Sequence, residues 1–169
     1  MPSRAADRDA FVARVEAHAR IVHKVVHTYC WAPDDRADLT QDILAQLWRA
    51  YPGYDPARPF STWMYRVALN VAISWLRGDG RRRRVHEPFD PVRHDAVAPP
   101  PRDEADERVR ALYTVIDGLA PLDRALLLLH LDDRTYHDIS GILGLSATNV
   151  ATRLSRLKAR LKQRMGDPT

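Results

Sequence analysis

The stretch FSTWMYRVALNVAISWLR, Phe60 to Arg77, decides the fold of this chain. It contains no proline, glycine or acidic residue, and Ser61 is placed to cap a helix by accepting a backbone N–H. At helical pitch, one face collects the apolar side chains Met64, Ala68, Val71, Ala72 and Trp75. The other face forms a narrow basic–aromatic stripe, which consists of Trp63, Arg66, Asn70, Ser74 and Arg77.

The basic–aromatic stripe lacks the Glu, Lys and Gln that a solvated helix face normally carries. A flat ring, two guanidinium groups and small hydrogen-bonding side chains suit phosphates and exposed bases. An ordinary core helix whose polar side is basic would show the same pattern. This helix alone therefore leaves both interpretations open.

Composition is consistent with a folded protein of one or two small domains, since the chain has 169 residues and 45% hydrophobic content. A net charge of +4 is only mildly basic, so nucleic-acid binding would depend on local clusters. The single cysteine, Cys30, excludes an internal disulfide and fits a reducing compartment. Without a signal-peptide pattern or a long apolar run, we expect a cytoplasmic protein with no membrane span.

Two helices are predicted before this stretch, over residues 7–30 and about 37–51, because apolar residues recur there every three or four positions. Pro33 and the two aspartates after it break the pattern between them. His23 and His27 have metal-ligand spacing on the first helix, but no third ligand follows at a matching interval. We expect no metal and no cofactor.

The second helix presents Asp38, Gln41 and Asp42 on its outer face. Acids early in a helix complement its dipole, which is a purely structural reason for them. A docking face for a partner helix would look the same.

A short loop, YPGYDPARP, joins this helix to the Phe60 stretch, and its three prolines and one glycine make it stiff. Tyr54 and Arg58 lie in the loop beside the basic–aromatic stripe, where they could form a pocket for an extruded base. A plain helix–helix connector is the alternative.

Downstream, Arg81 to Arg84 form a run that is typical of a nucleic-acid contact or a solvated tail. Residues 85–106 are rich in proline and charge and have no period, so they predict a linker. The predicted organisation is a first helical domain at 1–80, a basic then proline-rich linker at 81–106, and a second helical domain at 107–169.

The second domain contains the sharpest local pattern, TYHDISGILGLSATNVATRLSRLKARLKQR. Thr135 and Asp138 have capping-box spacing, Gly144 suits a left-handed helix end, and Ser146 can cap the next helix. Two capped helices joined by a short turn predict a helix-turn-helix, although an amphipathic helical hairpin is the simpler alternative. The outer face of the second helix presents hydroxyl, amide and arginine side chains suited to a DNA groove: Thr148, Asn149, Thr152, Arg153, Ser155 and Arg156.

The two halves together resemble a bacterial RNA polymerase sigma factor of the extracytoplasmic-function (ECF) group, in the sigma-70 family. DLTQDILAQLWRAYPGYDPARPFSTWMYRVALNVAISWLR, Asp38 to Arg77, is similar to conserved region 2. LAPLDRALLLLHLDDRTYHDISGILGLSATNVATRLSRLKARL, Leu119 to Leu161, is similar to region 4. The resemblance implies an all-α fold, with a region 2 bundle and a region 4 helix-turn-helix on a flexible linker.

The resemblance also implies roles, position by position. One segment would dock on the clamp helices of the largest polymerase subunit: Asp38, Leu39, Gln41 and Asp42. A second set would read and open the −10 promoter element, with a flipped base in the Tyr54–Phe60 loop: Tyr54, Arg58, Phe60, Trp63, Tyr65, Arg66 and Asn70. We add Ser74 and Arg77 to the predicted −10 contacts because they lie in the same basic–aromatic stripe. The outer face of the last helix would read the −35 element. The implied partners are core polymerase, including the flap of its second-largest subunit, promoter DNA, and an anti-sigma factor, which is typical of the group.

Three departures from the family pattern stand out. Arg36-Ala37-Asp38 replaces the usual Ala-Glu-Asp, which removes one acidic docking contact. Asp138-Ile139-Ser140 replaces Glu-Ile-Ala. Asn149-Val150-Ala151 replaces Thr-Val-Lys, which removes a basic contact from the −35 helix.

On this hypothesis the protein is not an enzyme by itself. A polymerase-independent helix-turn-helix regulator is the alternative, and it predicts tight duplex binding and a two-fold symmetric site. A metal enzyme built on His23 and His27 is disfavoured, because the nearby acids cluster at a helix start and do not converge on the histidines.

Overall fold

The computed structural model of the chain describes residues 4–78, 111 and 114–166. Every regular element in these ranges is helical, which confirms the all-α prediction. The elements are α1 (Arg4–Ala17), α2 (Ala19–Tyr29), α3 (Pro33–Ala50), η1 (Tyr51–Gly53), α4 (Phe60–Arg77), α8 (Pro121–Leu131), α9 (Tyr136–Leu143) and α10 (Ala147–Met165). No helix of the described part is long and apolar enough to cross a membrane.

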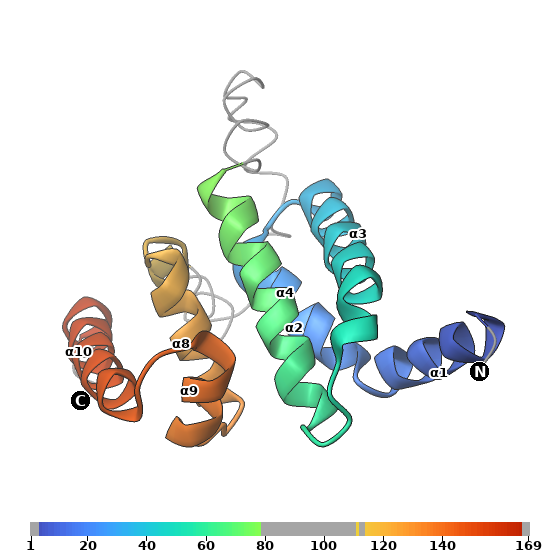
Figure 1. Cartoon of the computed structure of the whole chain (residues 1–169). Coiled ribbons are helices and arrows are strands. Elements are labelled where there is room, and N and C mark those ends of the chain that lie inside the picture. The colour runs from blue at the N-terminus through green and yellow to red at the C-terminus, as the bar shows by residue number, and fades with distance from the viewer. Residues whose placement is uncertain (1–3, 79–110, 112–113, 167–169) are drawn as a thin grey trace.

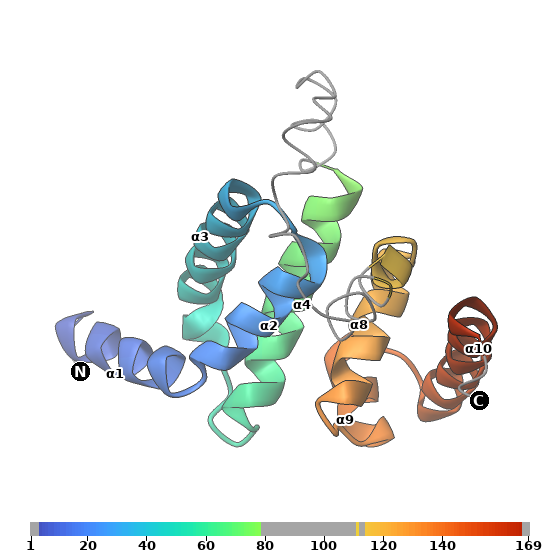
Figure 2. The same ribbon diagram turned by 180° about the vertical axis from the view of Figure 1, so that it is seen from behind.

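Helix α4 occupies the centre of the molecule, with α3 on one side and α8 and α9 on the other (Figure 1). Helix α4 contacts both α2 and α3. Its predicted apolar side chains Met64, Ala68, Ala72 and Trp75 are buried, while Val71 is half-buried. Seen from behind, α2 lies across α4 and next to α8 (Figure 2). The apolar face predicted for α4 is therefore the one that builds the core.

The single helix predicted over residues 7–30 is wrong, because the chain changes direction at His18. His18 has φ −119° and ψ 20°, and its Nδ1 donates to the carbonyl oxygen of Arg14 at 2.9 Å. The break lets α1 lead away from α2, so that Phe11 packs against the aromatic side chains at the end of α3. Apolar periodicity continues through such a break, so periodicity alone did not reveal it.

Helix α3 begins at Pro33, four residues before the predicted start. A proline at the first helical position needs no N–H partner, and Asp34 and Asp35 in the first turn complement the helix dipole. Arg36 Nε donates to the carbonyl oxygen of Cys30 at 3.0 Å and ties the start of α3 to the end of α2. The residues that interrupt the apolar pattern thus begin the helix.

The predicted cap of α4 by Ser61 is also wrong. Pro59 is the N-cap residue, and no side chain caps this helix. Ser61 Oγ instead accepts a hydrogen bond from Arg134 Nη1 at 3.4 Å, across to the second half of the chain.

The capping signals of the second half are confirmed. Thr135 and Asp138 form a reciprocal capping box at the start of α9. Gly144 ends α9 with φ 68°, and Ser146 Oγ accepts the backbone N–H three residues on at 3.1 Å. These contacts fix the angle between α9 and α10, which together form the predicted helix-turn-helix.

The linker predicted at 81–106, with its arginine run, lies outside the described residues. Before α8, residues 111 and 114–117 are described and are helical. The domain boundaries at 80 and 107 stay predictions. The described residues do show that one cluster of buried side chains runs through both halves, from Phe11 to Leu157.

Candidate nucleic-acid interface

The outer face of α4 presents the predicted basic–aromatic stripe to solvent. Arg66, Asn70, Ser74 and Arg77 are exposed, and Trp63 is half-buried at the N-terminal end of the row. Helix α4 contains no acidic residue. The helix therefore offers two guanidinium groups and two small hydrogen-bonding side chains on one face, without a carboxylate to repel phosphate.

The loop before α4 gathers aromatic rings beside this stripe. The ring centroids of Tyr54, Phe60 and Trp63 are each 5.2 Å from one another. The Tyr54 hydroxyl donates to the carbonyl oxygen of Arg58 at 2.7 Å, and Asp55 Oδ1 accepts the backbone N–H of Ala57 at 2.9 Å. These bonds hold the loop in one shape, as its prolines predict. Phe60 is only 7% exposed, so it supports the cluster from below, while half-buried Tyr54 and Trp63 offer ring surface.

Sequence reasoning missed two members of this site, Arg14 and His18. The Arg14 guanidinium carbon lies 5.5 Å from the Tyr54 ring centroid and 5.8 Å from that of Phe60, within cation–π range. The His18 ring lies 5.2 Å from the Phe60 ring. Both come from the junction of α1 and α2, and the break at that junction was itself not predicted. In the sequence, Arg14 is one arginine on an amphipathic helix, and no local pattern indicates that it contacts Tyr54 and Phe60.

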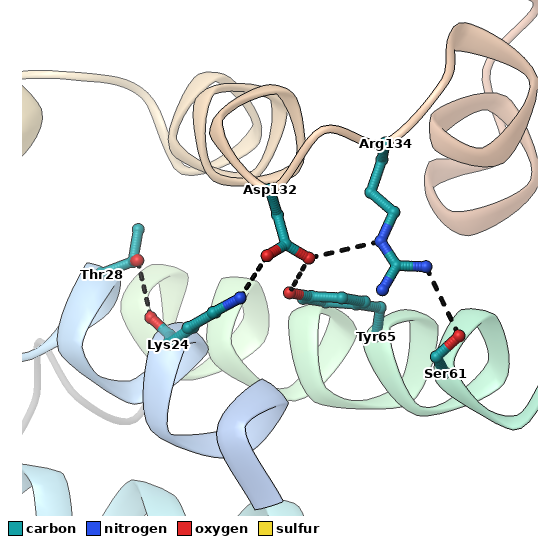
Figure 3. Close-up of polar contacts among 6 residues, drawn as sticks. All are labelled: Lys24, Thr28, Ser61, Tyr65, Asp132 and Arg134. Atoms are coloured by element: carbon teal, nitrogen blue, oxygen red, sulfur yellow. Dashed lines mark hydrogen bonds and ion pairs between the residues drawn. The ribbon is translucent and has the colours of Figure 1, made fainter. Parts of the chain in front are cut away.

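Tyr65 does not join the stripe. Its side chain is fully buried, and its hydroxyl donates to Asp132 Oδ2 at 2.8 Å (Figure 3). Burial, and then the hydrogen bond to Asp132, raise the pKa of Tyr65, so the hydroxyl stays protonated and acts as a donor. In this structure Tyr65 faces the second half of the chain and is not accessible to DNA.

Helix α10 carries the second predicted surface. Val150, Leu154 and Leu157 are buried against the rest of the helix-turn-helix. The six predicted contact residues are all exposed: Thr148, Asn149, Thr152, Arg153, Ser155 and Arg156. Arg153 Nε donates to Asn149 Oδ1 at 3.0 Å, which orients both side chains on the outer face. This helix also has no acidic residue.

The four residues of the predicted docking segment on α3 differ in solvent exposure. Asp38, Gln41 and Asp42 are exposed on one face, as expected. Leu39 is completely buried in the core beneath them, so it supports the face and is not available for contact. Arg36, which stands in the family's usual alanine position, is used in the α2–α3 corner.

The histidine pair of α2 forms no metal centre that the structure identifies. The rings of His23 and His27 stack at 3.8 Å, and His27 Nδ1 donates to the carbonyl oxygen of His23 at 2.9 Å. Burial lowers the pKa of His27, which favours its neutral form. Across residues 4–78 and 114–166, no group of three or more His, Cys, Asp or Glu side chains is arranged to hold a metal.

Comparison with known proteins gives two family matches in chain order. Residues 14–82 match the family model Sigma-70 region 2, and residues 109–161 match Sigma-70, region 4. The ECF RNA polymerase sigma factor SigE of Mycolicibacterium smegmatis is 29% identical over 88% of this chain, and the match spans 58% of SigE.

Two solved structures share the fold. CnrH in complex with the cytosolic domain of CnrY is 20% identical, with a TM-score of 0.68 over 96% of this chain and 91% of CnrH. The sigma factor RpoE in complex with the anti-sigma factor NepR, from Bartonella quintana, is 18% identical, with a TM-score of 0.63 over 96% of this chain and 98% of RpoE. At these identities the structural likeness concerns the arrangement of helices.

Proposed function

The chain belongs to the sigma-70 family of RNA polymerase sigma factors, in its ECF group, and from this premise we propose that it binds core RNA polymerase and directs it to a set of promoters. The observation that carries the proposal is the pair of exposed, acid-free helix faces on α4 and α10. Each lies within the region that the corresponding family match covers. A protein with two such faces, one per helical unit, is suited to contact DNA at two separate places.

In this proposal three surfaces of the protein bind three different partners or sites. The exposed face of α3 with Asp38, Gln41 and Asp42 docks on the clamp helices of the largest polymerase subunit. The outer face of α10 contacts the −35 element as duplex, mostly through phosphates, while the second helical unit rests on the flap of the second-largest subunit. The basic–aromatic stripe and the Tyr54–Phe60 loop hold the −10 element.

Promoter opening follows from binding the opened strand. Stacking an unpaired base on an aromatic side chain contributes roughly 1–3 kcal/mol, comparable with the few kcal/mol that unstacking a base costs. Capture of one or two non-template bases by Trp63 and Tyr54 therefore offsets most of the cost of melting there. No hydrolysis and no catalytic group of this chain is needed, and phosphodiester synthesis stays with the polymerase.

Regulation by an anti-sigma factor is part of the proposal, since RpoE of Bartonella quintana forms a complex with one. The protein acts where the polymerase acts, in the cytoplasm. A polymerase-independent helix-turn-helix regulator is not favoured, because it leaves the region 2 match and the stripe of α4 without a role.

The test is run-off transcription with purified core enzyme, with and without this protein, on a promoter library. New transcript start sites that depend on the protein are expected. If the protein neither co-elutes with core polymerase nor changes where transcripts begin, the proposal is wrong. Tight binding to a two-fold symmetric duplex without polymerase would favour the regulator instead.

A further inference from the structure

Arg14 brings a positive charge from α1 to the aromatic cluster of Tyr54, Phe60 and Trp63. Its guanidinium carbon lies 5.5 Å from the Tyr54 ring centroid and 5.8 Å from that of Phe60. The C-terminal end of α1 lies next to the loop that enters α4, while the rest of α1 leads away from the molecule (Figure 1). The cluster therefore has a cation beside it that comes from outside α3, α4 and the loop between them.

The break between α1 and α2 fixes the position of Arg14. His18 Nδ1 donates to the carbonyl oxygen of Arg14 at 2.9 Å, and the His18 ring lies 5.2 Å from the Phe60 ring. Before Arg14, the ring centroid of Phe11 lies 5.0 Å from each of two aromatic rings where α3 ends. Because α1 is held on both sides of Arg14, the guanidinium group extends from an anchored segment of backbone.

No carboxylate pairs with this guanidinium group within residues 4–78 and 114–166. None of the ion pairs found there involves Arg14, and Arg14 is exposed. Cation–π attraction to the two rings is enough to account for its position. An arginine can contact aromatic rings and also bind a phosphate through two N–H groups at once. The charge of Arg14 is therefore available to an anionic partner beside the rings.

Arg14 and Arg66 lie towards opposite ends of the aromatic cluster. Arg14 contacts the ring of Phe60, the first residue of α4, whereas exposed Arg66 lies about one helical turn beyond Trp63. In a nucleic-acid strand, every internal nucleotide has one phosphate on each side of its base. A base that stacks on Tyr54 and Trp63 thus has one phosphate towards Arg66 and the other towards Arg14.

We propose that Arg14 binds the backbone phosphate next to the base captured by the Tyr54–Phe60 loop, on the side away from Arg66. The single strand is then bound on both sides of the captured base. This inference deepens the proposed function and rests on it, since the strand concerned is the opened −10 strand. Phosphate contacts position a strand without reading its sequence, so Arg14 strengthens capture whichever base enters the loop.

The first test measures binding of the full chain to a fluorescein-labelled oligothymidylate of about 12 nucleotides, by anisotropy over a range of salt concentrations. Arg14→Gln is expected to weaken binding about fivefold at low salt, as the loss of one exposed ionic contact does. The slope of log affinity against log salt should become shallower by about 0.7, the value for one phosphate of a single strand. An arginine that only covers the rings would leave this slope unchanged.

Arg8→Gln is the matched control, because Arg8 is exposed on the same helix and carries the same charge. It lies about 9 Å before Arg14 along the helix axis, at 1.5 Å per residue. This control is expected to keep the wild-type slope. The melting temperatures of both variants show whether a loss of affinity comes from a less stable protein. A lower melting temperature of Arg14→Gln with an unchanged slope would assign Arg14 to the fold and overturn the proposal.

The second test locates the phosphate in the complex with core polymerase. Fork-shaped DNA from a promoter found by run-off transcription carries one neutral methylphosphonate at a time along its single-stranded −10 segment. Wild type is expected to lose affinity at the position next to the captured base. Arg14→Gln should lose none there, because the interaction is already absent, while Arg8→Gln should lose as much as wild type. Equal losses for wild type and Arg14→Gln at every position would refute the phosphate contact.

The outcomes separate this inference from the proposed function. If the salt slope changes as expected and run-off transcription never depends on the protein, Arg14 is a single-strand contact and the proposed function is wrong. If transcription depends on the protein while Arg14→Gln matches Arg8→Gln in both tests, the role of Arg14 is wrong and the proposed function stands.

Discussion

Exposed side chains make the proposed contacts, whereas their buried neighbours belong to the core and hold the helix in place. Asp38 and Gln41 are exposed on α3 while Leu39 beneath them is buried, so the three have different roles despite being neighbours. The same holds on α4, where Asn70 is exposed and Tyr65 is not. Mutations at exposed positions test binding without disturbing the core.

Removing the docking contacts should weaken association with core polymerase. For the double variant Asp38→Ala, Gln41→Ala we expect about tenfold weaker binding, equal to about 1.4 kcal/mol, since rim contacts each contribute little. A pull-down with purified core enzyme measures this, and circular dichroism checks that the helices remain. Gln46→Ala, exposed on the same helix, is the control and should bind as wild type does. Equal retention of the double variant and wild type would contradict the docking assignment.

Removing stripe contacts should spare polymerase binding and impair promoter opening. Asn70→Ala is the cleaner variant because Asn70 is exposed, whereas Trp63→Ala also removes half-buried ring area from the Tyr54 cluster. We expect each to lower permanganate reactivity of −10 thymines severalfold, in line with a loss of about 1 kcal/mol or more per base contact. The melting temperature of Trp63→Ala shows whether a loss of reactivity reflects lost base binding or a less stable protein. Wild-type reactivity in both variants would remove the stripe from the opening mechanism.

Among the helices, the α9–α10 pair depends most on local signals. Its capping box, left-handed glycine and serine cap occur where the sequence predicts them. No side-chain cap marks the starts of α2, α3 and α4, although Pro33 and the two acids after it give α3 a local signal of another kind. Helices that begin at strong local signals are predictable from the chain alone.

The glycine at the end of α9 offers a matched pair of substitutions. Gly144 has φ 68°, so Gly144→Ala should destabilise the protein by about 1 kcal/mol through backbone strain. Gly141 lies within α9, so Gly141→Ala should stabilise it by up to about 1 kcal/mol through helix propensity. A Cβ added at either position meets no atom within 4 Å, so neither variant introduces a steric clash. Urea unfolding measures both, and equal shifts of the same sign would contradict the turn geometry.

Across the molecule, the junction between the two helical units combines apolar packing with polar contacts. A continuous buried cluster and the contacts of Asp132 with Lys24 and Tyr65 hold the two helical units together. Salt does not weaken the apolar part of this junction. The Lys24–Asp132 pair is partly exposed, so salt screens its electrostatic attraction. Closure therefore combines a general apolar attraction with a specific polar contact.

Acid should weaken this junction in a defined range. The folded-state pKa of Asp132 is lowered, so its stabilising contribution is fully present above the unfolded value of about 3.9 and is lost as pH falls through the folded value. Asp132→Asn is expected to be less stable than wild type by about 1 kcal/mol at neutral pH. That difference should be constant above about pH 5 and shrink below about pH 4. Urea unfolding from neutral to acid pH measures it, and a constant difference over the whole range would show that the ionised carboxylate is not responsible.

The amino-acid sequence by itself determined the helical class, the helix-turn-helix with its caps, the exposed faces of α4 and α10, and the family. These follow from short-range rules, because apolar periodicity and capping act within a few residues of the chain. Only the tertiary structure decided the break at His18, the placement of Arg14 over the Tyr54 and Phe60 rings, the burial of Tyr65 and the role of Asp132. The last three depend on residues that are distant in the sequence, up to 108 positions for Lys24 and Asp132, and no local pattern encodes which side chains meet across such a separation. The break at His18 lies in a continuous apolar pattern, so periodicity does not reveal it.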